Sequence, residues 1–413
     1  MPATVNAALV PEKPPADGPH LLDATMFWAP QGCGGVRRVI STKRGALVSR
    51  GWRHTLLAPG VQGPGFVDSG GWTLPGSGGY RFVADRKRAA RLIEQAAPDI
   101  IESADPFTLA WSTLDAARAL QVPTVAFCHS NLPDMVAHWV GDRLARRGYG
   151  RWAARQAQRY LARVYAGFDL VLAPSLGMTE MLRSLGVRHA RHQPLGVSTK
   201  VFRPEAADAS WRRALLHRLG LAPHTRLLVY SGRFAPEKNL ELLAQAVELL
   251  GPGHVLIAMG AGPRPPRGRR VITFPPQHDD AKLARLLASG DAFVHAGDQE
   301  TFGLAALEAM ACGTPLVTSA HAGLGELVDG VGRTLTSRRP ADWAEAIRAT
   351  LVSRDHASIR IGLERARSHD WTAVIDGLSQ RYLRLLERGA LDTDSSHLTR
   401  PLLLSGGREW TAV

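Results

Sequence analysis

Two glutamates eight residues apart carry the strongest chemical signal in the chain. Glu300 follows a short apolar run, and Glu308 lies within the helix-like run after it. Phe302, Gly303 and Leu304 form the turn that starts this helix. A helix start offers backbone N–H groups without internal partners and a partial positive charge, which suit phosphate or sugar oxygens. With two carboxylates to accept from hydroxyls, the segment predicts a site for a phosphorylated sugar compound rather than a metal or a nucleophile.

A second segment supplies cations. The apolar run Leu227–Tyr230 leads into Gly232, and Arg233 and Lys238 follow just before another helix-like run. Two cations at the carboxyl end of a strand, beside a helix start, can clamp a diphosphate. The chain has 50 Lys plus Arg, of which only six are Lys. A lysine kept here in so arginine-rich a chain indicates a need for a compact ammonium group. Taken alone, each pair also has a purely structural explanation. The two acids could cap a helix and face solvent, and the two cations could be ordinary surface residues.

Together these segments resemble the retaining GT-B glycosyltransferases of glycosyltransferase family 4. GRFAPEKN resembles the family's phosphate-binding segment, and ETFGLAALE resembles its Glu-x7-Glu signature. A glycine loop at Gly34 and Gly35, a histidine at His129, a connector at 194–204 and a glycine turn at Gly262 follow the family's order. The set spans most of the chain, so the resemblance rests on several motifs rather than one.

The resemblance implies an α/β fold of the GT-B type, with two Rossmann-like doubly wound domains facing across a cleft. The alternation of apolar strands with helices independently predicts parallel α/β sheets. Two irregular stretches are an expected open loop at Gly60–Gly79 and a long helical region at Pro133–Ala166. The predicted division is a flexible N-terminal tail (1–19), an acceptor domain (20–198), a donor domain (199–370), a closing helix that packs back on the first domain (371–389) and a flexible C-terminal tail (390–413).

The resemblance also implies roles for individual residues. His129 would bond the donor sugar near the reacting centre, and Glu300 and Glu308 would accept from sugar and ribose hydroxyls. Arg233 and Lys238 would neutralise the departing nucleoside diphosphate, while the acceptor attacks from the same face. The predicted catalytic residues are His129, Arg233, Lys238 and Glu300. The predicted donor-binding residues are Gly34, Gly35, Gly232, Arg233, Lys238, Gly262, Glu300, Phe302, Gly303, Leu304 and Glu308.

The chain is strongly basic, with a net charge of +13 and a pI near 10.3. Such a charge favours anionic lipid, a phosphorylated glycan or nucleic acid as a neighbour. Nucleic acid is the least supported, since no zinc-finger spacing or RNA-binding aromatic signature is present. Arginines recur every four residues along one predicted helix, which indicates either a solvated face or a patch for anionic lipid or a phosphorylated acceptor. The predicted membrane or acceptor patch is Arg147, Arg151, Arg155, Arg159 and Trp152.

The predicted activity is transfer of a hexose, with mannose favoured, from a nucleotide-sugar donor to a membrane-linked or cell-envelope glycan. GDP-mannose and a UDP-sugar are both candidate donors, so a glucosyl- or galactosyltransferase is one alternative and a non-catalytic GT-B subunit is another. No acidic metal-binding motif accompanies the site segments, so no metal and no further cofactor are expected. No apolar run reaches the ~20 residues of a membrane helix. No secretory signal is evident. A cytoplasmic protein, peripheral at the inner face of the plasma membrane, is expected.

Overall fold

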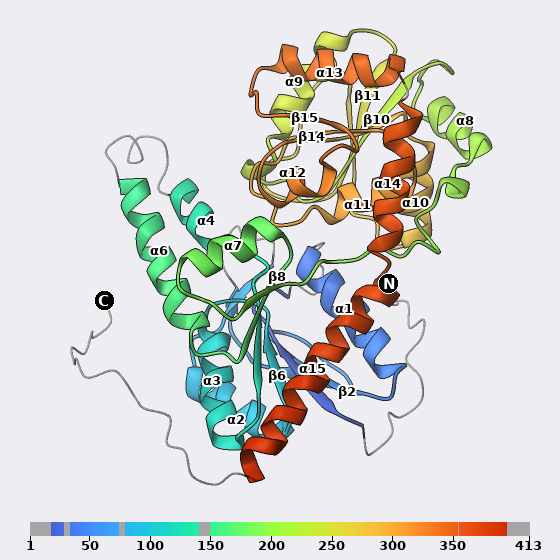
Figure 1. Cartoon of the computed structure of the whole chain (residues 1–413). Coiled ribbons are helices and arrows are strands. Elements are labelled where there is room, and N and C mark those ends of the chain that lie inside the picture. The colour runs from blue at the N-terminus through green and yellow to red at the C-terminus, as the bar shows by residue number, and fades with distance from the viewer. Residues whose placement is uncertain (1–17, 29–33, 74–78, 140–148, 354, 395–413) are drawn as a thin grey trace.

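The computed structural model describes residues 18–28, 34–73, 79–139, 149–353 and 355–394. These residues form two lobes, each built on a parallel sheet flanked by helices (Figure 1). Within these ranges no helix is both long enough and apolar enough to cross a membrane.

The N-terminal lobe holds a seven-stranded sheet in the order β3-β2-β1-β6-β7-β8-β9, with every neighbouring pair parallel. A small antiparallel pair, β4 with β5, lies outside it. The strands are β1 (His20–Ala24), β2 (Arg53–Ala58), β3 (Phe66–Asp68), β4 (Trp72–Thr73), β5 (Arg81–Phe82), β6 (Ile100–Ser103), β7 (Thr124–Phe127), β8 (Leu170–Ala173) and β9 (Ala190–His192). The helices are α1 (Gly35–Val48), α2 (Arg86–Ala96), α3 (Thr108–Leu120), α4 (Leu132–Trp139), α6 (Tyr149–Tyr165) and α7 (Leu176–Ser184).

The C-terminal lobe holds a six-stranded parallel sheet in the order β12-β11-β10-β13-β14-β15. Its strands are β10 (Arg226–Ser231), β11 (His254–Met259), β12 (Val271–Phe274), β13 (Ala292–His295), β14 (Leu316–Ser319) and β15 (Arg333–Leu335). Its α-helices are α8 (Ala209–Arg218), α9 (Leu240–Leu250), α10 (Asp280–Ser289), α11 (Leu304–Ala311), α12 (Ala322–Val328), α13 (Pro340–Ser353) and α14 (His356–Ser368). Two short 3₁₀ helices, η1 (Pro204–Ala206) and η2 (Pro236–Lys238), precede α8 and α9, and α15 (Trp371–Asp394) ends the described chain.

Both sheets are buried on both faces, which explains why a central strand such as β10 reads as a continuous apolar run. In β1, Leu21 joins a core with α1 and α15, whereas the next residue, Leu22, joins a core with α2 and α3. In β10, Leu227 and Val229 pack toward α10 and α11, and Leu228 packs toward α9 and α13. Successive side chains in a strand point to opposite faces, so each sheet is covered on both sides. This is the predicted doubly wound arrangement.

The strand order reverses once in each sheet, between β1 and β6 and between β10 and β13. In an open parallel sheet such a reversal leaves a crevice at the carboxyl ends of the two central strands, where ligands bind. The segments that follow β10 and β13 carry Arg233, Lys238 and Glu300, so the C-terminal reversal point is where the predicted cations and the predicted acid should meet.

The structure corrects the expectation for the two irregular stretches. Gly60–Gly79 is not simply open, because β3 pairs with β2 through Leu56–Phe66 and Leu57–Val67 and extends the sheet. The short length of β3 gives too few alternating residues for a strand signal. The helical region 133–166 contains two helices, α4 and α6, whose connecting residues 140–148 lie outside the described ranges.

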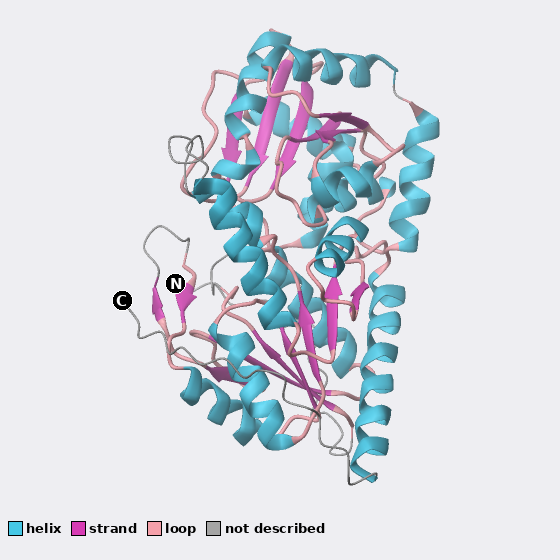
Figure 2. Cartoon of the chain, turned by 60° about the vertical axis from the view of Figure 1, so that its left-hand side comes forward, coloured by secondary structure: helices cyan, strands magenta, loops and turns pink. Residues whose placement is uncertain are grey.

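The chain crosses between the lobes twice, and the two crossings lie side by side. Val197 N donates to His369 O at 2.9 Å, and Trp371 N donates to Val197 O at 3.1 Å. Thr199 Oγ1 also donates to Asp370 Oδ2 at 2.5 Å. Beyond this point α15 runs along the N-terminal lobe beside α1 (Figures 1 and 2). The helix extends to Asp394, past its predicted end at residue 389.

A buried group of charges joins α15 to the N-terminal sheet. Lys43 Nζ, from α1, lies 2.6 Å from Asp23 Oδ1 and 2.5 Å from Glu102 Oε1, and all three side chains are at most 1% exposed. Tyr382 Oη, from α15, donates to Glu102 Oε2 at 2.5 Å, and His54 Nε2 lies 2.7 Å from Asp23 Oδ2. Burial alone would raise the pKa of Asp23, but Lys43 and His54 outweigh it and lower that pKa to about 2. The cluster therefore joins α15 and α1 to strands β1, β2 and β6, with Lys43 as the cation between the two carboxyl groups.

Candidate active site

The predicted cation and the predicted acid contact each other at the reversal point of the C-terminal sheet. Lys238 Nζ, at the end of η2, donates to Glu300 Oε1 at 2.5 Å. His295 Nε2, at the end of β13, lies 3.1 Å from the same oxygen. About a fifth of the Glu300 side chain is exposed, whereas Lys238 is largely buried. No role was predicted for His295, although its place at a strand end, five residues before Glu300, is typical of a site residue.

Glu300 is an ionised carboxylate in this setting. Burial alone would raise its pKa, but Lys238 and His295 outweigh burial and hold the pKa well below its usual range. A carboxylate that stays charged can accept hydrogen bonds from two or more hydroxyls. Its negative charge is shared with two donors, so it is a weak nucleophile and a good anchor for a sugar.

Arg233 pairs with a different carboxylate. Its Nη2 is 2.8 Å from Glu237 Oε1, one turn along the segment, and about half of the side chain is exposed. Both predicted clamp cations therefore pair with carboxylates here. A phosphate group arriving at the ends of β10 and η2 can compete for them, because both side chains are long and flexible.

Two glycines shape the loops around the site. A Cβ on Gly262 would lie 2.3 Å from Phe234 O, so only glycine lets the loop after β11 approach the loop after β10. Gly303 has φ 104°, in the region that favours glycine, and it caps the start of α11. The N–H groups of the first turn of α11 are thereby presented beside Glu300. Phe302 itself is buried against His369, with ring centroids 5.8 Å apart, so it supports the turn from behind.

The N-terminal lobe reaches this site directly. Thr301 Oγ1 donates to His129 O at 3.0 Å across the two lobes. Gly34 caps α1, and a Cβ on Gly35 would lie 3.4 Å from Leu304 Cδ1. The predicted glycine loop, the predicted histidine and the Glu300 turn therefore meet, although they come from three distant parts of the sequence. Thr301, for which no role was predicted, is one of the links.

His129 is a neutral hydrogen-bonding group. Its ring stacks on Phe127 at 4.2 Å with an interplanar angle of 4°. Its Nε2 is buried and has no hydrogen-bond partner among the described residues. Burial lowers its pKa to about 3, with a further contribution from Lys43, so the imidazole is uncharged near neutral pH. An unsatisfied buried ring nitrogen is costly, and a sugar hydroxyl bound at this place would satisfy it.

Glu308 lies deeper, one turn into α11, and is almost fully buried. Arg38 Nη1, from α1 of the other lobe, is 3.0 Å from Glu308 Oε1, and Arg38 Nη2 is 2.7 Å from Asp280 Oδ1. Burial raises the pKa of Glu308 to about 7, although Arg38 opposes the rise. Arg38 had no predicted role. The sequence feature that could have indicated a role is its position, since Arg38 is a cation in the first helical turn after the glycine loop.

The predicted basic patch lies on α6, away from these groups. Arg151, Arg155 and Arg159 are exposed and form no ion pair within the described part of the chain, and Trp152 is 57% exposed. Arg147 lies outside the described residues. The predicted site residues thus fall into two groups, one between the lobes and one on an outer helix.

Sequence comparison identifies the family. A profile described as Glycosyltransferase Family 4 matches residues 33–201, and one described as Glycosyl transferases group 1 matches residues 225–353. The chain belongs to glycosyltransferase family 4. The GDP-mannose-dependent alpha-(1-6)-phosphatidylinositol dimannoside mannosyltransferase of Mycobacterium tuberculosis is 30% identical over 370 residues, which cover 85% of this chain and 93% of that protein. A GDP-mannose-dependent alpha-mannosyltransferase of the same organism is 28% identical over 302 residues, covering 71% and 75% of the two chains.

Solved structures agree with the family 4 assignment. Sucrose-phosphate synthase from Thermosynechococcus elongatus matches with a TM-score of 0.72 at 21% identity, covering 90% of this chain and all of that one. Anabaena HepE in complex with UDP-glucose matches with a TM-score of 0.63 at 17% identity, covering 91% and 99%. At these identities the likeness concerns the fold. The predicted GT-B fold is confirmed, and the chain is a glycosyltransferase that uses a nucleotide-sugar donor.

Proposed function

We propose that this glycosyltransferase moves mannose from GDP-mannose, with retention of the anomeric configuration, to a lipid-linked glycan acceptor. The observation that carries the proposal is the pairing of Lys238 with the ionised Glu300 at the reversal point of the C-terminal sheet, where the next residue, Thr301, bonds to the His129 carbonyl of the other lobe. The choice of mannose rests on the two mycobacterial relatives, whose names state a GDP-mannose donor.

In the proposed reaction the protein stabilises the leaving group rather than forming a bond to the sugar. Lys238 turns from Glu300 toward the diphosphate, and Arg233 turns from Glu237, so that both cations meet the growing negative charge. Glu300 and His129 hold sugar hydroxyls. Because Glu300 already shares its charge with His295, it is poorly suited to attack the anomeric carbon. The acceptor hydroxyl attacks on the face that the diphosphate leaves, and a phosphate oxygen takes its proton.

A UDP-sugar is the second candidate donor, because the HepE structure of the same fold contains UDP-glucose. A thermal-shift comparison of GDP, UDP and ADP separates the two. A ligand at 100 times its Kd stabilises the native state by ~2.7 kcal/mol. For domains of ~200 residues this corresponds to a rise in Tm of roughly 5–10 °C.

We expect GDP to give the largest rise in Tm and UDP and ADP to give much smaller ones at equal concentration. A larger rise in Tm with UDP than with GDP would show that the donor is a UDP-sugar and not GDP-mannose. No rise with any of the three would contradict the assignment of the nucleotide site between the lobes.

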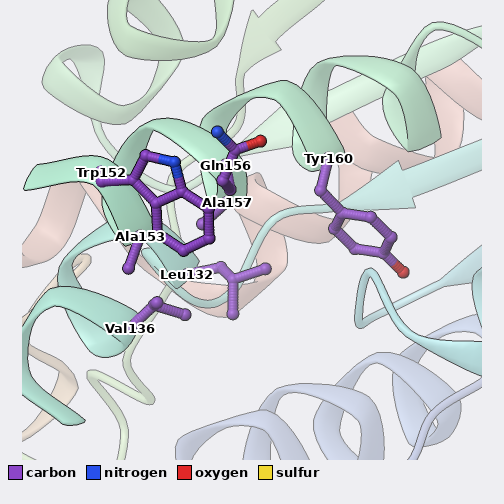
Figure 3. A pocket seen from close by; sticks show the side chains of 7 residues that line it. All are labelled: Leu132, Val136, Trp152, Ala153, Gln156, Ala157 and Tyr160. Atoms are coloured by element: carbon purple, nitrogen blue, oxygen red, sulfur yellow. The ribbon is translucent and has the colours of Figure 1, made fainter. Parts of the chain in front are cut away.

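The acceptor side of the proposal rests on an apolar groove beside the basic patch. Leu132 and Val136 of α4 face Trp152 and Tyr160 of α6 across the groove, whose volume is about 340 Å³ (Figure 3). α4 begins three residues after His129, so the groove lies on the same segment as the reaction site. Exposed aromatic rings beside a row of arginines suit the headgroup level of an anionic bilayer. We therefore propose that the enzyme works at the cytoplasmic face of a membrane.

Binding to lipid vesicles tests this surface. Each arginine near an anionic bilayer contributes about 1 kcal/mol, and salt weakens the attraction. The paired substitution Arg151→Glu and Arg155→Glu should therefore abolish co-sedimentation with anionic vesicles and leave nucleotide binding unchanged. The matched control is Lys87→Glu with Arg91→Glu, which reverses two exposed charges at the same spacing on α2.

Parent and control should sediment with anionic vesicles in low salt and much less in high salt, and neither should sediment with neutral vesicles. If the α6 variant sediments as the parent does, α6 is a solvated face and the basicity of the chain serves another neighbour.

A further inference from the structure

Arg38 connects the two lobes at the edge of the donor site. It lies in the first turn of α1, in the N-terminal lobe, and its guanidinium reaches α10 and α11 of the C-terminal lobe. Asp280 is about half exposed, whereas only 6% of the Glu308 side chain is exposed. Since water screens the first contact far more than the second, the contact with Glu308 is the stronger electrostatic interaction.

The charge of Glu308 depends on few groups. In the described ranges the ionisable side chains that act on it are Arg38 from α1, Asp280 from α10 and Cys312, one turn further along α11. Burial disfavours the charged form, Arg38 favours it and Asp280 disfavours it, and together they leave the pKa at about 7. Near neutral pH a small change in these neighbours therefore decides whether Glu308 is a carboxylate or an acid.

Arg38 leaves part of Glu308 available. Its Nη1 contacts Oε1, and no described residue hydrogen-bonds to Oε2. An ionised Oε2 can accept from a ribose hydroxyl, whereas a protonated carboxyl loses much of that acceptor strength. The salt bridge also fixes the carboxylate's orientation, because the guanidinium is held by Asp280 on its other arm.

We propose that Arg38 is a positioning residue for the donor: from the opposite lobe it keeps Glu308 oriented and ionised to accept from the ribose. The inference rests on the proposed function and on the ribose role that the family resemblance implies for Glu308. It follows that the nucleoside part of the site is complete only when the lobes are together, so that separation of α1 from α11 weakens donor binding without any change in the C-terminal lobe.

The test is the pH dependence of GDP affinity, measured by calorimetry between pH 5.5 and 8.5 at constant ionic strength. In the parent chain affinity should rise with pH through about 7 as Glu308 ionises. Arg38→Met removes the cation, so the midpoint should move up by about one unit or more. At pH 7.0 the ionised fraction of Glu308 then falls from about one half to a tenth or less, which lowers GDP affinity about fivefold or more. Most of this loss should be recovered at pH 8.5.

Asp280→Asn should shift the midpoint of the GDP affinity curve in the opposite direction. It removes a negative charge that raises the pKa of Glu308, so the midpoint of the GDP affinity curve should move down, below that of the parent. Glu308→Gln should bind GDP weakly with no midpoint of this kind, and adding Arg38→Met to it should cause no further shift. GDP is the ligand in every titration, so the ionisation of GDP itself contributes equally to the curves of all variants.

Three outcomes would overturn the inference. The first is an Arg38→Met midpoint equal to that of the parent, and the second is a loss of affinity that is uniform over the whole pH range. If Arg38→Met fails to fold, Asp280→Asn alone decides, and the third outcome is a midpoint for it that does not move down. If the parent binds neither GDP nor UDP, the proposed nucleotide site itself would be contradicted.

Discussion

Replacement of Lys238 by alanine will lower turnover by at least about 100-fold while the fold persists. Removal of a single preorganised donor to charge that develops in a transition state costs ~3–4 kcal/mol. Lys238 is the buried cation of the site and lies at the reversal point of the C-terminal sheet, where a diphosphate would leave. Its loss also removes one of the two donors that hold Glu300 in place. Arg233→Ala should cost a similar factor, because the second clamp cation acts on the same leaving group.

Steady-state kinetics with GDP-mannose and a lipid-linked glycan would measure the loss. The matched control is Lys282→Ala, which removes an exposed lysine paired with Asp279 on α10 of the same lobe. The control should keep turnover within about twofold of the parent, since exposed ion pairs contribute little. Turnover of Lys238→Ala within a few-fold of the parent, with an unchanged melting curve, would refute the clamp assignment.

Lys43→Met will destabilise the protein by about 3–5 kcal/mol, because removal of one partner leaves buried charge uncompensated. Asp23 and Glu102 are both inaccessible to water and both rely on the ammonium group of Lys43. Protonation of the carboxyls can relieve only part of this cost, since each would still lack the hydrogen bond that Lys43 donates. Tyr382→Phe should cost less, about 1–2 kcal/mol, because it removes one hydrogen bond to Glu102 and leaves Lys43 paired with both carboxyl groups.

Denaturant unfolding of the N-terminal lobe would measure both effects. Lys87→Met is the matched control, as Lys87 is an exposed lysine on α2, and it should change stability by less than about 0.5 kcal/mol. A loss for Lys43→Met no larger than that of the control would mean that water reaches the cluster. If Lys43→Met released α15 but left the free energy of unfolding of the rest of the lobe unchanged, Lys43 would act only through Tyr382.

The pattern of the sequence was enough to predict the class of fold. The central strand β10 is buried on both faces, so its apolar run Leu227–Tyr230 is continuous and predicts a strand without reference to any partner. The glycines of the site report local backbone needs, such as the positive φ of Gly303 at the start of α11. Short edge strands such as β3 were missed, because their formation depends on a neighbouring strand more than on their own residues.

The family motifs predicted which residues act on the donor, because Arg233 and Lys238 belong to one motif and Glu300 and Glu308 to another. Tertiary structure alone decided which of them meet. Lys238 and Glu300 are 62 residues apart in sequence and share a hydrogen bond, since the reversal of strand order brings β10 beside β13. Arg38 and Asp280 are 242 residues apart and belong to different lobes. Contacts between elements depend on sheet order and lobe docking, which local sequence does not encode, and so the partners of Glu308 became visible only in the folded chain.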